Sequence, residues 1–436
     1  MSTSESEVKV IVERCEALYH DVDLQAVVDW KARTGRAAIG FLPIYVPREI
    51  IDAAGMLPVG MRGGGDQIEI IRGDAYFQSY ICQIPRSTIE LGLTGRLDAL
   101  DGVLFPSICD VIRNLSGMWQ LLFPEKYARY LDVPQNFDSA VGGVFYRREL
   151  EGLRDDLEKL GGRPIDADAL RASIVRYNAN RQALERLMTL RREAPWTAPA
   201  DESYLVIRAG DLLPVDEHTQ LIDDYVAAAQ RAHAEGARPM RDRTPVVISG
   251  AFCEQPPLPL IRTLERAGCY VVWDDMTLGA RWLTADVSTE GDPLLALSEA
   301  FLHHSTPTAS VYEPGAHKGQ PLCDQVRRCG AEGVIFAAPS FCDPALLDQP
   351  MLQRALDRAG IPWTAFKYAE NLGQFQVIRE QAGTFADSIR LWSEQGTEQA
   401  SEQRSERRHE QGKALESSRG NGERPGATSE QGSDHA

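Results

Sequence analysis

Two stretches of the chain repeat the same order of apolar and polar positions. The first, AAIGFLPIYVPREIIDAAGMLPVGM, covers residues 37–61, and the second, PVVISGAFCEQPPLPLIRTLERAGCYVVWDD, covers residues 245–275. Each is typical of an apolar strand, a turn that contains proline, an amphipathic helix, a glycine stop and a second strand. This order predicts parallel strands joined by right-handed crossovers.

The repeat continues farther along the chain. DGVLFPSICD at residues 101–110 matches EGVIFAAPSFCDP at residues 332–344, since each has an acidic residue, glycine, an apolar strand, Pro-Ser and then Cys-Asp. We therefore predict an α/β fold with two similar doubly wound parallel-sheet domains, a helical connecting region and a disordered C-terminal tail.

The predicted boundaries follow these patterns. They are an N-terminal helical segment at 1–36, a first α/β domain at 37–148, a helical connecting region at 149–240, a second α/β domain at 241–392 and a tail at 393–436. The tail has almost no large apolar residues after Trp392. Such a segment cannot bury enough surface to offset the entropy of ordering, so we predict that it is disordered.

Length and charge narrow the class of protein. The chain has 436 residues and a formal net charge of −17, and this acidic balance disfavours nucleic-acid binding. No apolar run approaches the roughly 18 residues that suggest a membrane helix. The acidic, polar start of the chain lacks the basic and apolar regions of a signal peptide. We expect a cytoplasmic protein that binds neither nucleic acid nor membrane.

Cysteine is the residue type best suited to carry the chemistry. There are eight cysteines and no C-x-x-C pair, so zinc-ribbon and thioredoxin-like sites lack their main support. In a cytoplasmic chain these residues are buried small hydrophobes, metal ligands or reactive thiols rather than disulfides. A metal site would have to gather cysteines that are distant in sequence.

Two cysteines occupy equivalent places in the repeat. Cys109 and Cys342 each follow the carboxyl end of a predicted parallel strand, where ligands of open α/β sheets bind. Cys82 falls in DAYFQSYICQIPRSTIELGL, a predicted helix that leads into the strand ending at Cys109. Three converging thiolates suit an iron–sulfur cluster that leaves one iron for another ligand. Each cysteine taken alone also fits simple packing in the core.

The other candidates carry weaker signals. Cys323 is a candidate fourth ligand and Cys253 is the next candidate, whereas Cys269 and Cys15 fit a core strand and a core helix face. Cys329 does not share a helix face with Cys323. The turn MRGGGD, residues 61–66, has backbone that can admit a phosphate or serve as a plain loop. No P-loop motif for ATP is present, and the adjacent His303 and His304 fit the surface of a helix.

Five segments together resemble one known family. They are GFLPIYVPREIIDAAGMLPVGM, YFQSYICQIPRS, GVLFPSICD, FAAPSFCDP and ENLGQFQVIREQAGTFADSI. The chain resembles the 2-hydroxyacyl-CoA dehydratase / benzoyl-CoA reductase family over roughly residues 30–393, and within it the B subunit of ATP-dependent benzoyl-CoA reductase. The tail matches nothing in the family.

The resemblance implies a fold, a cofactor and partners. Family members pair two α/β subunits, and each holds a [4Fe–4S] cluster through three cysteines, which correspond to Cys82, Cys109 and Cys342 here. In the reductases, separate ATP-hydrolysing subunits pass single electrons from ferredoxin to the cluster-bearing pair. The pair then reduces benzoyl-CoA to a cyclic dienoyl-CoA in the anaerobic degradation of aromatic compounds. No motif assigns a proton donor or a contact to coenzyme A.

Two other functions remain open from the sequence. The dehydratase branch uses the same scaffold to eliminate water from a 2-hydroxyacyl-CoA through a ketyl radical, and the ligand cysteines do not distinguish the branches. A non-enzymatic scaffold or maturation protein with structural thiols is the other alternative.

Overall fold

The computed structural model describes residues 2–250, 256–311, 318–369 and 375–391. Met1–Ala386 forms one compact unit, which contains both sheets and the helices around them. The predicted disordered tail at 393–436 lies outside the described residues.

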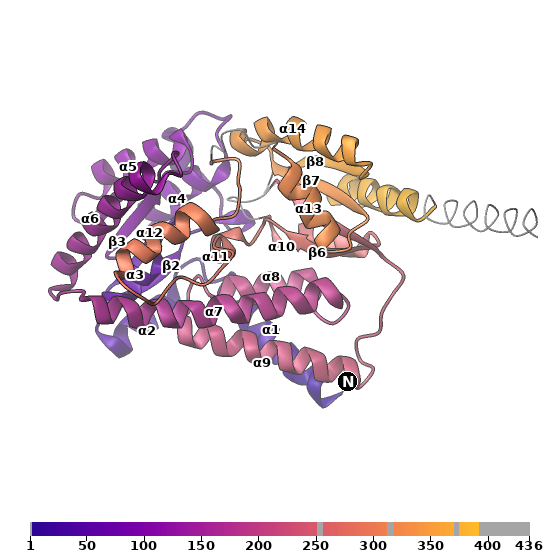
Figure 1. Ribbon diagram of the computed structural model, residues 1–436, viewed down its shortest axis with the longest axis horizontal. Coiled ribbons are helices and arrows are strands. Elements are labelled where there is room, and N and C mark those ends of the chain that lie inside the picture. Colours follow the sequence, from indigo (N-terminus) through magenta and orange to yellow (C-terminus); the bar gives the residue numbers. More distant parts are fainter. Residues whose placement is uncertain (1, 251–255, 312–317, 370–374, 392–436) are drawn as a thin grey trace, which may run out of the picture. The chain divides into compact units, whose positions relative to one another are not determined.

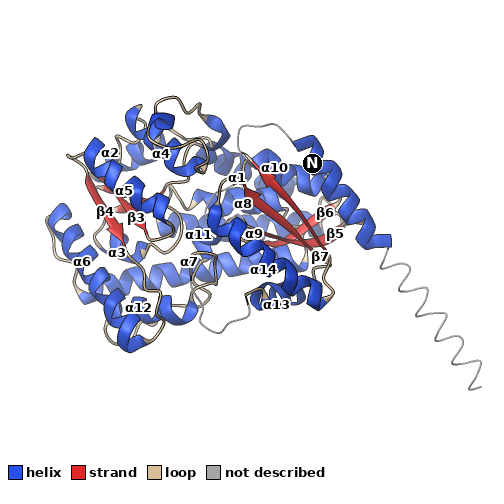
Figure 2. Ribbon diagram, turned by 90° about the horizontal axis from the view of Figure 1, so that it is seen from above, coloured by secondary structure: helices blue, strands red, loops and turns tan. Residues whose placement is uncertain are grey.

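Two four-stranded parallel sheets organise the described chain, as the repeat predicted (Figures 1 and 2). The strands of the first sheet are β1 (Ala38–Phe41), β2 (Leu57–Gly60), β3 (Gly102–Pro106) and β4 (Tyr127–Leu131). The strands of the second sheet are β5 (Thr244–Ser249), β6 (Cys269–Asp274), β7 (Gly333–Pro339) and β8 (Trp363–Tyr368).

The two sheets share one topology. Their strand orders are β2-β1-β3-β4 and β6-β5-β7-β8, so corresponding strands occupy corresponding places. In both sheets the pairing to the third strand begins at that strand's first residue, since Ile39 pairs with Gly102 and Val246 pairs with Gly333. These central strands are buried on both faces, which explains their nearly continuous apolar sequences.

Helices occupy the crossovers and the ends of the sheets. Around the first sheet are α3 (Arg48–Ala53), α4 (Gln83–Leu93), α5 (Asp110–Leu122) and α6 (Val144–Gly161). Around the second are α10 (Leu258–Arg266), α11 (Leu278–Arg281), α13 (Gln320–Arg328) and α14 (Asp343–Ala359), and residues 375–391 are also helical. The helix α12 (Pro293–His304) comes from the second half of the chain but packs on α6 and α7 and contributes to the core of the first sheet. Short turns of 3-10 or π geometry span Gly65–Gln67, Gly73–Ala75 and Ser139–Gly143.

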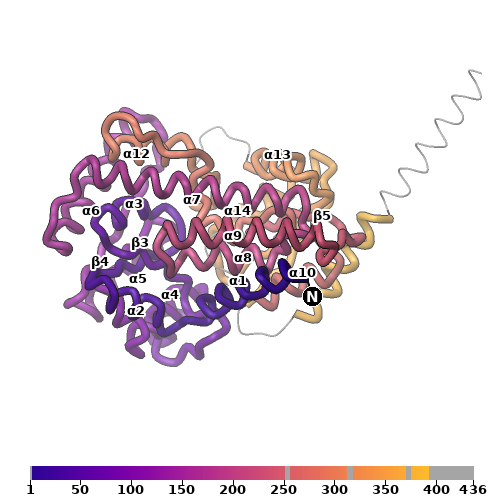
Figure 3. Tube along the Cα trace, turned by 90° about the horizontal axis from the view of Figure 1, so that it is seen from below, coloured from indigo at the N-terminus to yellow at the C-terminus, as the bar shows by residue number. Residues whose placement is uncertain are grey.

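A layer of helices contacts both sheets. It contains the N-terminal α1 (Thr3–Tyr19), with α2 (Gln25–Thr34) following, and α7 (Ala167–Glu193), α8 (Ala200–Ala209) and α9 (Val215–Ala234). Helices α1, α7, α8 and α9 lie side by side, and the long α7 packs on both α3 and β6 (Figure 3). The predicted helical region between the sheets is therefore present.

The largest hydrophobic core extends beyond the first sheet. It includes residues of β1, β2 and β3 and also Val311, Ala338, Cys342 and Ala345 from the second half of the chain. The carboxyl end of β7 therefore packs into the same core as the first sheet. This packing brings the equivalent strand ends of the repeat toward each other.

Candidate functional site

The three cysteines named by the family resemblance all occupy the same kind of position. Cys82, Cys109 and Cys342 are the residues that immediately precede α4, α5 and α14, and each is the helix N-cap. The N-terminus of a helix carries a partial positive charge, which favours a thiolate over a thiol. The N-cap position of these cysteines was not predicted from the sequence. A signal for it exists at Cys109 and Cys342, because each is followed by an aspartate, a residue common in the first turn of a helix.

Cys109 and Cys342 are brought together by the shared core. Cys342 is buried in that core and Cys109 packs against it. Burial raises the pKa of the Cys109 thiol to about 11, the backbone N–H groups of Ile112 and Val111 lower it, and the nearby Cys342 raises it further. The two thiols are thus close enough to interact electrostatically, and a metal ion would have to displace the proton of Cys109.

Cys82 is placed differently from the prediction. The expected helix through this residue is wrong, because α4 begins only at Gln83 after irregular residues 76–82. Pro85 explains the boundary: it lies in the first turn, where a missing N–H costs little, whereas an upstream extension would put it in the helix interior. The helix α4 lies between β2 and β3 in the chain, and Cys109 follows the carboxyl end of β3.

A buried carboxylate fixes the segment before Cys82. Glu90 in α4 accepts hydrogen bonds from the backbone N–H groups of Ile71, Arg72 and Gly73 at 2.9, 2.5 and 2.9 Å. Burial tends to raise the pKa of Glu90, but these three donors outweigh it and the pKa is lowered. The loop that carries Cys82 is therefore tied to the helix that follows it.

The three cysteines do not form a ready-made metal cage. Among the residues that the structure describes, no three His, Cys, Asp or Glu side chains gather as a metal site. The structure places Cys109 and Cys342 at one core and Cys82 at the start of α4, so the ligand set stays a prediction.

The remaining cysteines have other surroundings. Cys15, Cys269 and Cys323 are at most 2% exposed in helix or strand cores, which fits packing. Cys329 accepts a hydrogen bond from the Gln325 side chain at 2.9 Å. Cys253 lies outside the described residues.

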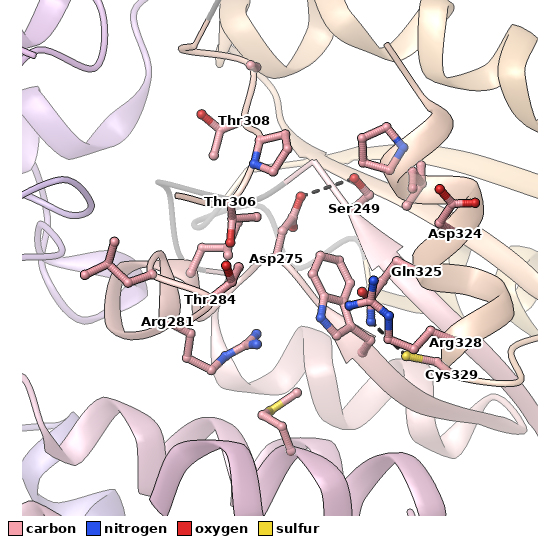
Figure 4. A pocket seen from close by; sticks show the side chains of 18 of the residues that line it. Ser249, Asp275, Arg281, Thr284, Thr306, Thr308, Asp324, Gln325, Arg328 and Cys329 are labelled. Atoms are coloured by element: carbon pink, nitrogen blue, oxygen red, sulfur yellow. Dashed lines mark hydrogen bonds between the residues drawn. The ribbon is translucent and has the colours of Figure 1, made fainter. Parts of the chain in front are cut away.

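Residues of the segment 306–311 line two cavities. One, of about 670 Å³, is lined by Cys109, Asp110, Arg113 and Tyr130, and by Ser310. The other, of about 740 Å³, is lined by Thr306, Thr308 and Ala309 at one end and lies against β5, β6 and α7 (Figure 4). Small-molecule sites commonly have volumes in this range.

An unusual backbone turn follows β1 at the edge of the first sheet. Ile44 and Tyr45 both have left-handed conformations, with φ of 68° and 65°. Such a conformation is strained for a β-branched residue such as Ile44. The fully buried Tyr45 hydroxyl is hydrogen-bonded to the hydroxyl of Thr308 in the wall of the larger cavity. Nothing in the sequence indicated this pair.

The glycine turn at residues 61–66 lines a smaller cavity of about 70 Å³. Arg62 in this turn forms a buried bidentate ion pair with Asp211, with both N···O distances at 3.0 Å. Gly63 and Gly65 have positive φ, as their flexibility predicted.

His303 is exposed and pairs with Glu299 at 2.9 Å. No helix in the described ranges is both long and apolar enough to span a bilayer.

The fold and the repeated cysteines define a parallel α/β protein in which two equivalent cysteines, Cys109 and Cys342, each precede a helix. The sequence profile of the 2-hydroxyglutaryl-CoA dehydratase D-component family matches residues 43–389, and the chain belongs to this family.

Individual relatives refine the comparison. The chain is 58% identical over 385 residues to the C subunit of benzoyl-CoA reductase from Thauera aromatica, and the match covers 88% of this chain and 99% of the relative. It is 30% identical to the beta subunit of (R)-2-hydroxyglutaryl-CoA dehydratase from Acidaminococcus fermentans, covering 81% of this chain and 93% of that relative. It is 26% identical to the (R)-phenyllactyl-CoA dehydratase beta subunit from Clostridium sporogenes, covering 82% and 93%.

The comparisons correct one prediction. The family resemblance is confirmed, but the expected likeness to the B subunit of benzoyl-CoA reductase is wrong, because the strong match is to the C subunit. Both kinds of subunit were expected to carry the same cysteine ligands, and those contexts alone do not separate them.

Proposed function

We propose that this chain is the C-type subunit of a benzoyl-CoA reductase, a multi-subunit oxidoreductase. The observation that carries the proposal is 58% identity extending over 99% of a benzoyl-CoA reductase C subunit. Its proposed partners are a second cluster-bearing subunit and ATP-hydrolysing subunits that receive electrons from ferredoxin. The proposed reaction reduces the aromatic ring of benzoyl-CoA to a cyclic dienoyl-CoA, and the proposed location is the cytoplasm.

We propose Cys82, Cys109 and Cys342 as the ligands of one [4Fe–4S] cluster in this subunit. The cluster, when bound, supplies single electrons at low potential. Support comes from the family resemblance, the placement of Cys109 and Cys342 at the same core, and the helix N-terminus behind each thiol. Thiolate is the form that binds iron, and the helix dipoles offset part of the penalty of burying that charge. The cavity beside Cys109 provides space next to its thiol.

The surrounding residues have a defined part in this proposal. The shared core keeps water from Cys342, and the Glu90 anchor holds the loop of Cys82 in place. Exclusion of water matters because electron transfer to an aromatic thioester is strongly uphill and competes with side reactions.

The test is anaerobic co-purification of the chain with its neighbouring subunits, followed by iron and sulfide analysis and EPR. The complex is then assayed with benzoyl-CoA, ATP and a low-potential electron donor. We expect cluster iron in this subunit and ATP-dependent loss of the aromatic ring. A complex that contains iron but leaves benzoyl-CoA unchanged would contradict the reductase assignment.

The second candidate is a subunit of a 2-hydroxyacyl-CoA dehydratase. It is favoured by the family profile and by the 30% identity to a dehydratase beta subunit. Elimination of water from a 2-hydroxyacyl-CoA by the same purified complex, without ring reduction, would establish it. A metal-free, air-stable chain that purifies alone would instead support the scaffold or maturation role.

A further inference from the structure

The segment that ends at Cys82 has little hydrophobic burial of its own. None of residues 74–83, all of which the structure describes, is buried, and Tyr80 is 63% exposed. Phe77 packs against the largest core but is only partly buried. A segment of this kind keeps one conformation only if hydrogen bonds or ion pairs hold it, because little apolar burial offsets the entropy of ordering. The position of the Cys82 loop, residues 71–82, therefore depends on polar contacts.

We propose that Arg86 and Glu90 are positioning residues, which close the Cys82 loop onto α4 and hold the Cys82 thiol in place as a ligand of the proposed cluster. This inference rests on the proposed function, because it takes the cluster and its cysteine ligands from there. It adds how the chain orients one of those ligands, and it assigns that role to two residues that are not ligands themselves.

Glu90 fixes the start of the loop through one oxygen atom. Its Oε2 accepts all three hydrogen bonds from the backbone N–H groups of residues 71–73, and Glu90 is 6% exposed. Burial acts to raise the pKa of Glu90, but the three donors more than offset it, so the group is a carboxylate at neutral pH. Hydrogen bonds to an ionised acceptor are about twice as strong as those between neutral groups. Glu90 is therefore a strong tie between the loop and α4.

Gly73 lets the backbone of the loop reach the backbone of α4. A Cβ atom at position 73 would lie 2.1 Å from the carbonyl oxygen of Arg86 and 3.0 Å from its carbonyl carbon. The turn Gly73–Ala75 packs directly on α4. Because a helix backbone cannot move aside as a flexible side chain can, a larger residue at position 73 would push the loop away from the helix.

Arg86 connects the beginning of the loop to its end. Its Nε donates to the Asp74 carboxylate at 2.7 Å, and its Nη1 donates to the Ile81 carbonyl at 3.4 Å. Asp74 follows the residues that Glu90 holds, and Ile81 immediately precedes Cys82. One guanidinium group therefore bridges the two ends of the loop beside the cysteine.

The spacing of these residues places them along one side of α4. Cys82 is the N-cap of the helix, and Arg86 and Glu90 follow it at intervals of four residues. Residues four apart in an α-helix are neighbours on its surface. A shift of the whole helix would thus move all three residues together, whereas the loss of either tie would release the Cys82 loop alone.

The order of the loop affects how firmly Cys82 is held as a ligand. A ligand on an unordered segment loses conformational freedom when it binds a metal, which weakens binding. Residues that orient a metal ligand without touching the metal commonly change metal affinity by about 10- to 100-fold. We therefore expect Arg86 and Glu90 to slow the dissociation of the Cys82 thiolate.

The measurement is the alkylation rate of each cysteine of this chain in the anaerobically purified complex, with iodoacetamide as the reagent and peptide mass spectrometry as the readout. A thiolate reacts only while it is not bound to iron, so the rate at Cys82 reports how often that ligand dissociates. Glu90→Leu, which removes the acceptor at similar volume, should raise the Cys82 rate by about tenfold, with much smaller changes at Cys109 and Cys342. Glu90→Gln, which keeps an acceptor oxygen without the charge, should lie between Glu90→Leu and the parent.

The same two substitutions at Glu265 are the matched control. Glu265 is also buried and accepts a hydrogen bond from the backbone N–H of Ala200 at 2.9 Å, but that partner belongs to α8 rather than to the Cys82 loop. Both control variants should leave the Cys82 rate at the parent value.

Arg86→Met tests the second tie without altering a buried residue, so it keeps the test open if Glu90→Leu fails to fold. It should raise the Cys82 rate by about fivefold, less than Glu90→Leu does, because the ion pair with Asp74 is partly exposed. Arg96→Met breaks the ion pair of Arg96 with Asp23 at 3.2 Å and is its control, with an expected Cys82 rate equal to that of the parent.

The outcomes separate this inference from the proposed function. If the parent complex contains cluster iron and reduces benzoyl-CoA, but Glu90→Leu and Arg86→Met leave the Cys82 rate unchanged, the inference is wrong and the function stands. Equal acceleration at Cys82, Cys109 and Cys342 would also overturn the inference, because it would show a general loosening of the fold. If the parent contains iron without reducing the ring, while the variants release Cys82 selectively, the inference stands and the reductase function is wrong.

Discussion

The side-chain hydroxyls of Tyr45 and Thr308 are hydrogen-bonded to each other although 263 positions separate the two residues. Tyr45 follows β1 of the first sheet in a strained left-handed turn, and Thr308 lines the cavity on the second sheet. The contact therefore links the end of one strand of the first sheet to the wall of the cavity on the second sheet.

We predict that Tyr45 and Thr308 are energetically coupled. Tyr45→Phe and Thr308→Ala should each lower the free energy of unfolding by about 1 kcal/mol, because each leaves the other hydroxyl without this partner. In a double-mutant cycle measured by urea unfolding, the free energy of unfolding of the double variant should lie within about 0.5 kcal/mol of that of the less stable single variant. Simple addition of the two losses would show that the hydroxyls act independently.

Replacement of any proposed ligand by alanine should remove cluster iron. We expect Cys82→Ala, Cys109→Ala and Cys342→Ala to lose most of the iron and sulfide of this subunit and to abolish ring reduction, because three thiolates share one cluster. Iron analysis and EPR of the anaerobically purified complex provide the measurement.

Cys323→Ala is the matched control for those variants. Cys323 is 2% exposed and packs in a separate core, so its loss should cost about 1 kcal/mol of stability and no iron. If Cys82→Ala keeps its full iron while the other two variants lose theirs, Cys82 is not a ligand and another residue takes its place. The proposal of a cluster would still stand.

Removal of the buried Arg191 guanidinium should be strongly destabilising. Its side chain is fully buried and pairs with Asp274 at 2.5 Å, so Arg191→Met would leave a buried carboxylate whose remaining cationic partner among the described residues is the more distant Arg281. We expect a loss of about 3–5 kcal/mol, measured by thermal or urea unfolding. Arg186→Met on the same helix breaks the exposed pair with Asp223 and should cost less than about 1 kcal/mol. Equal losses of stability in the two variants would contradict this prediction, because the burial of the Asp274 carboxylate would then carry no additional cost.

His218 should make the protein sensitive to mild acid. Burial lowers the pKa of His218 to about 4, and the charge of Arg48 acts in the same direction. Its Nε2 donates to the Val206 carbonyl at 3.0 Å, and its Nδ1 accepts from the Asn180 amide at 3.1 Å, which is the neutral ring. Since the unfolded chain has a His pKa near 6.5, the unfolded state binds more protons between about pH 4 and 6.5.

Stability from neutral His218 is therefore present above about pH 6.5 and is lost as the pH falls toward 4. The parent should lose about 2 kcal/mol more than His218→Gln between pH 7 and pH 5 in urea unfolding. Glu265, whose pKa burial raises to about 7, has the opposite dependence, but it is present in both proteins and cancels in the comparison. Parallel pH curves for the two proteins would refute the assignment.

Truncation after Ser393 should leave folding, cluster iron and ring reduction unchanged. The removed segment is polar in composition, and the match to the C subunit of benzoyl-CoA reductase covers 99% of that relative within 88% of this chain. Thermal unfolding, iron analysis and the benzoyl-CoA assay of the truncated complex test this. A drop of more than about twofold in any of them would assign a role to the tail.

The sequence alone determined the layout of the fold. Apolar strands alternating with amphipathic helices predict parallel sheets, because each crossover must cover the face of the sheet that it leaves. The repeated Pro-Ser and Cys-Asp pattern predicted that Cys109 and Cys342 follow equivalent strands, and both do. The same local logic failed at Cys82, where periodicity suggested a helix but Pro85 and the Glu90 anchor decide where the helix begins.

Tertiary structure decided which of these positions meet. The placement of Cys109 and Cys342 at one core and the hydrogen bond between Tyr45 and Thr308 depend on how the carboxyl end of β7 packs into the core of the first sheet. No local pattern encodes that packing, because it joins residues more than 200 positions apart through non-directional burial of apolar surface. Periodicity specifies which face of an element is buried, and only the assembled core specifies what that face is buried against.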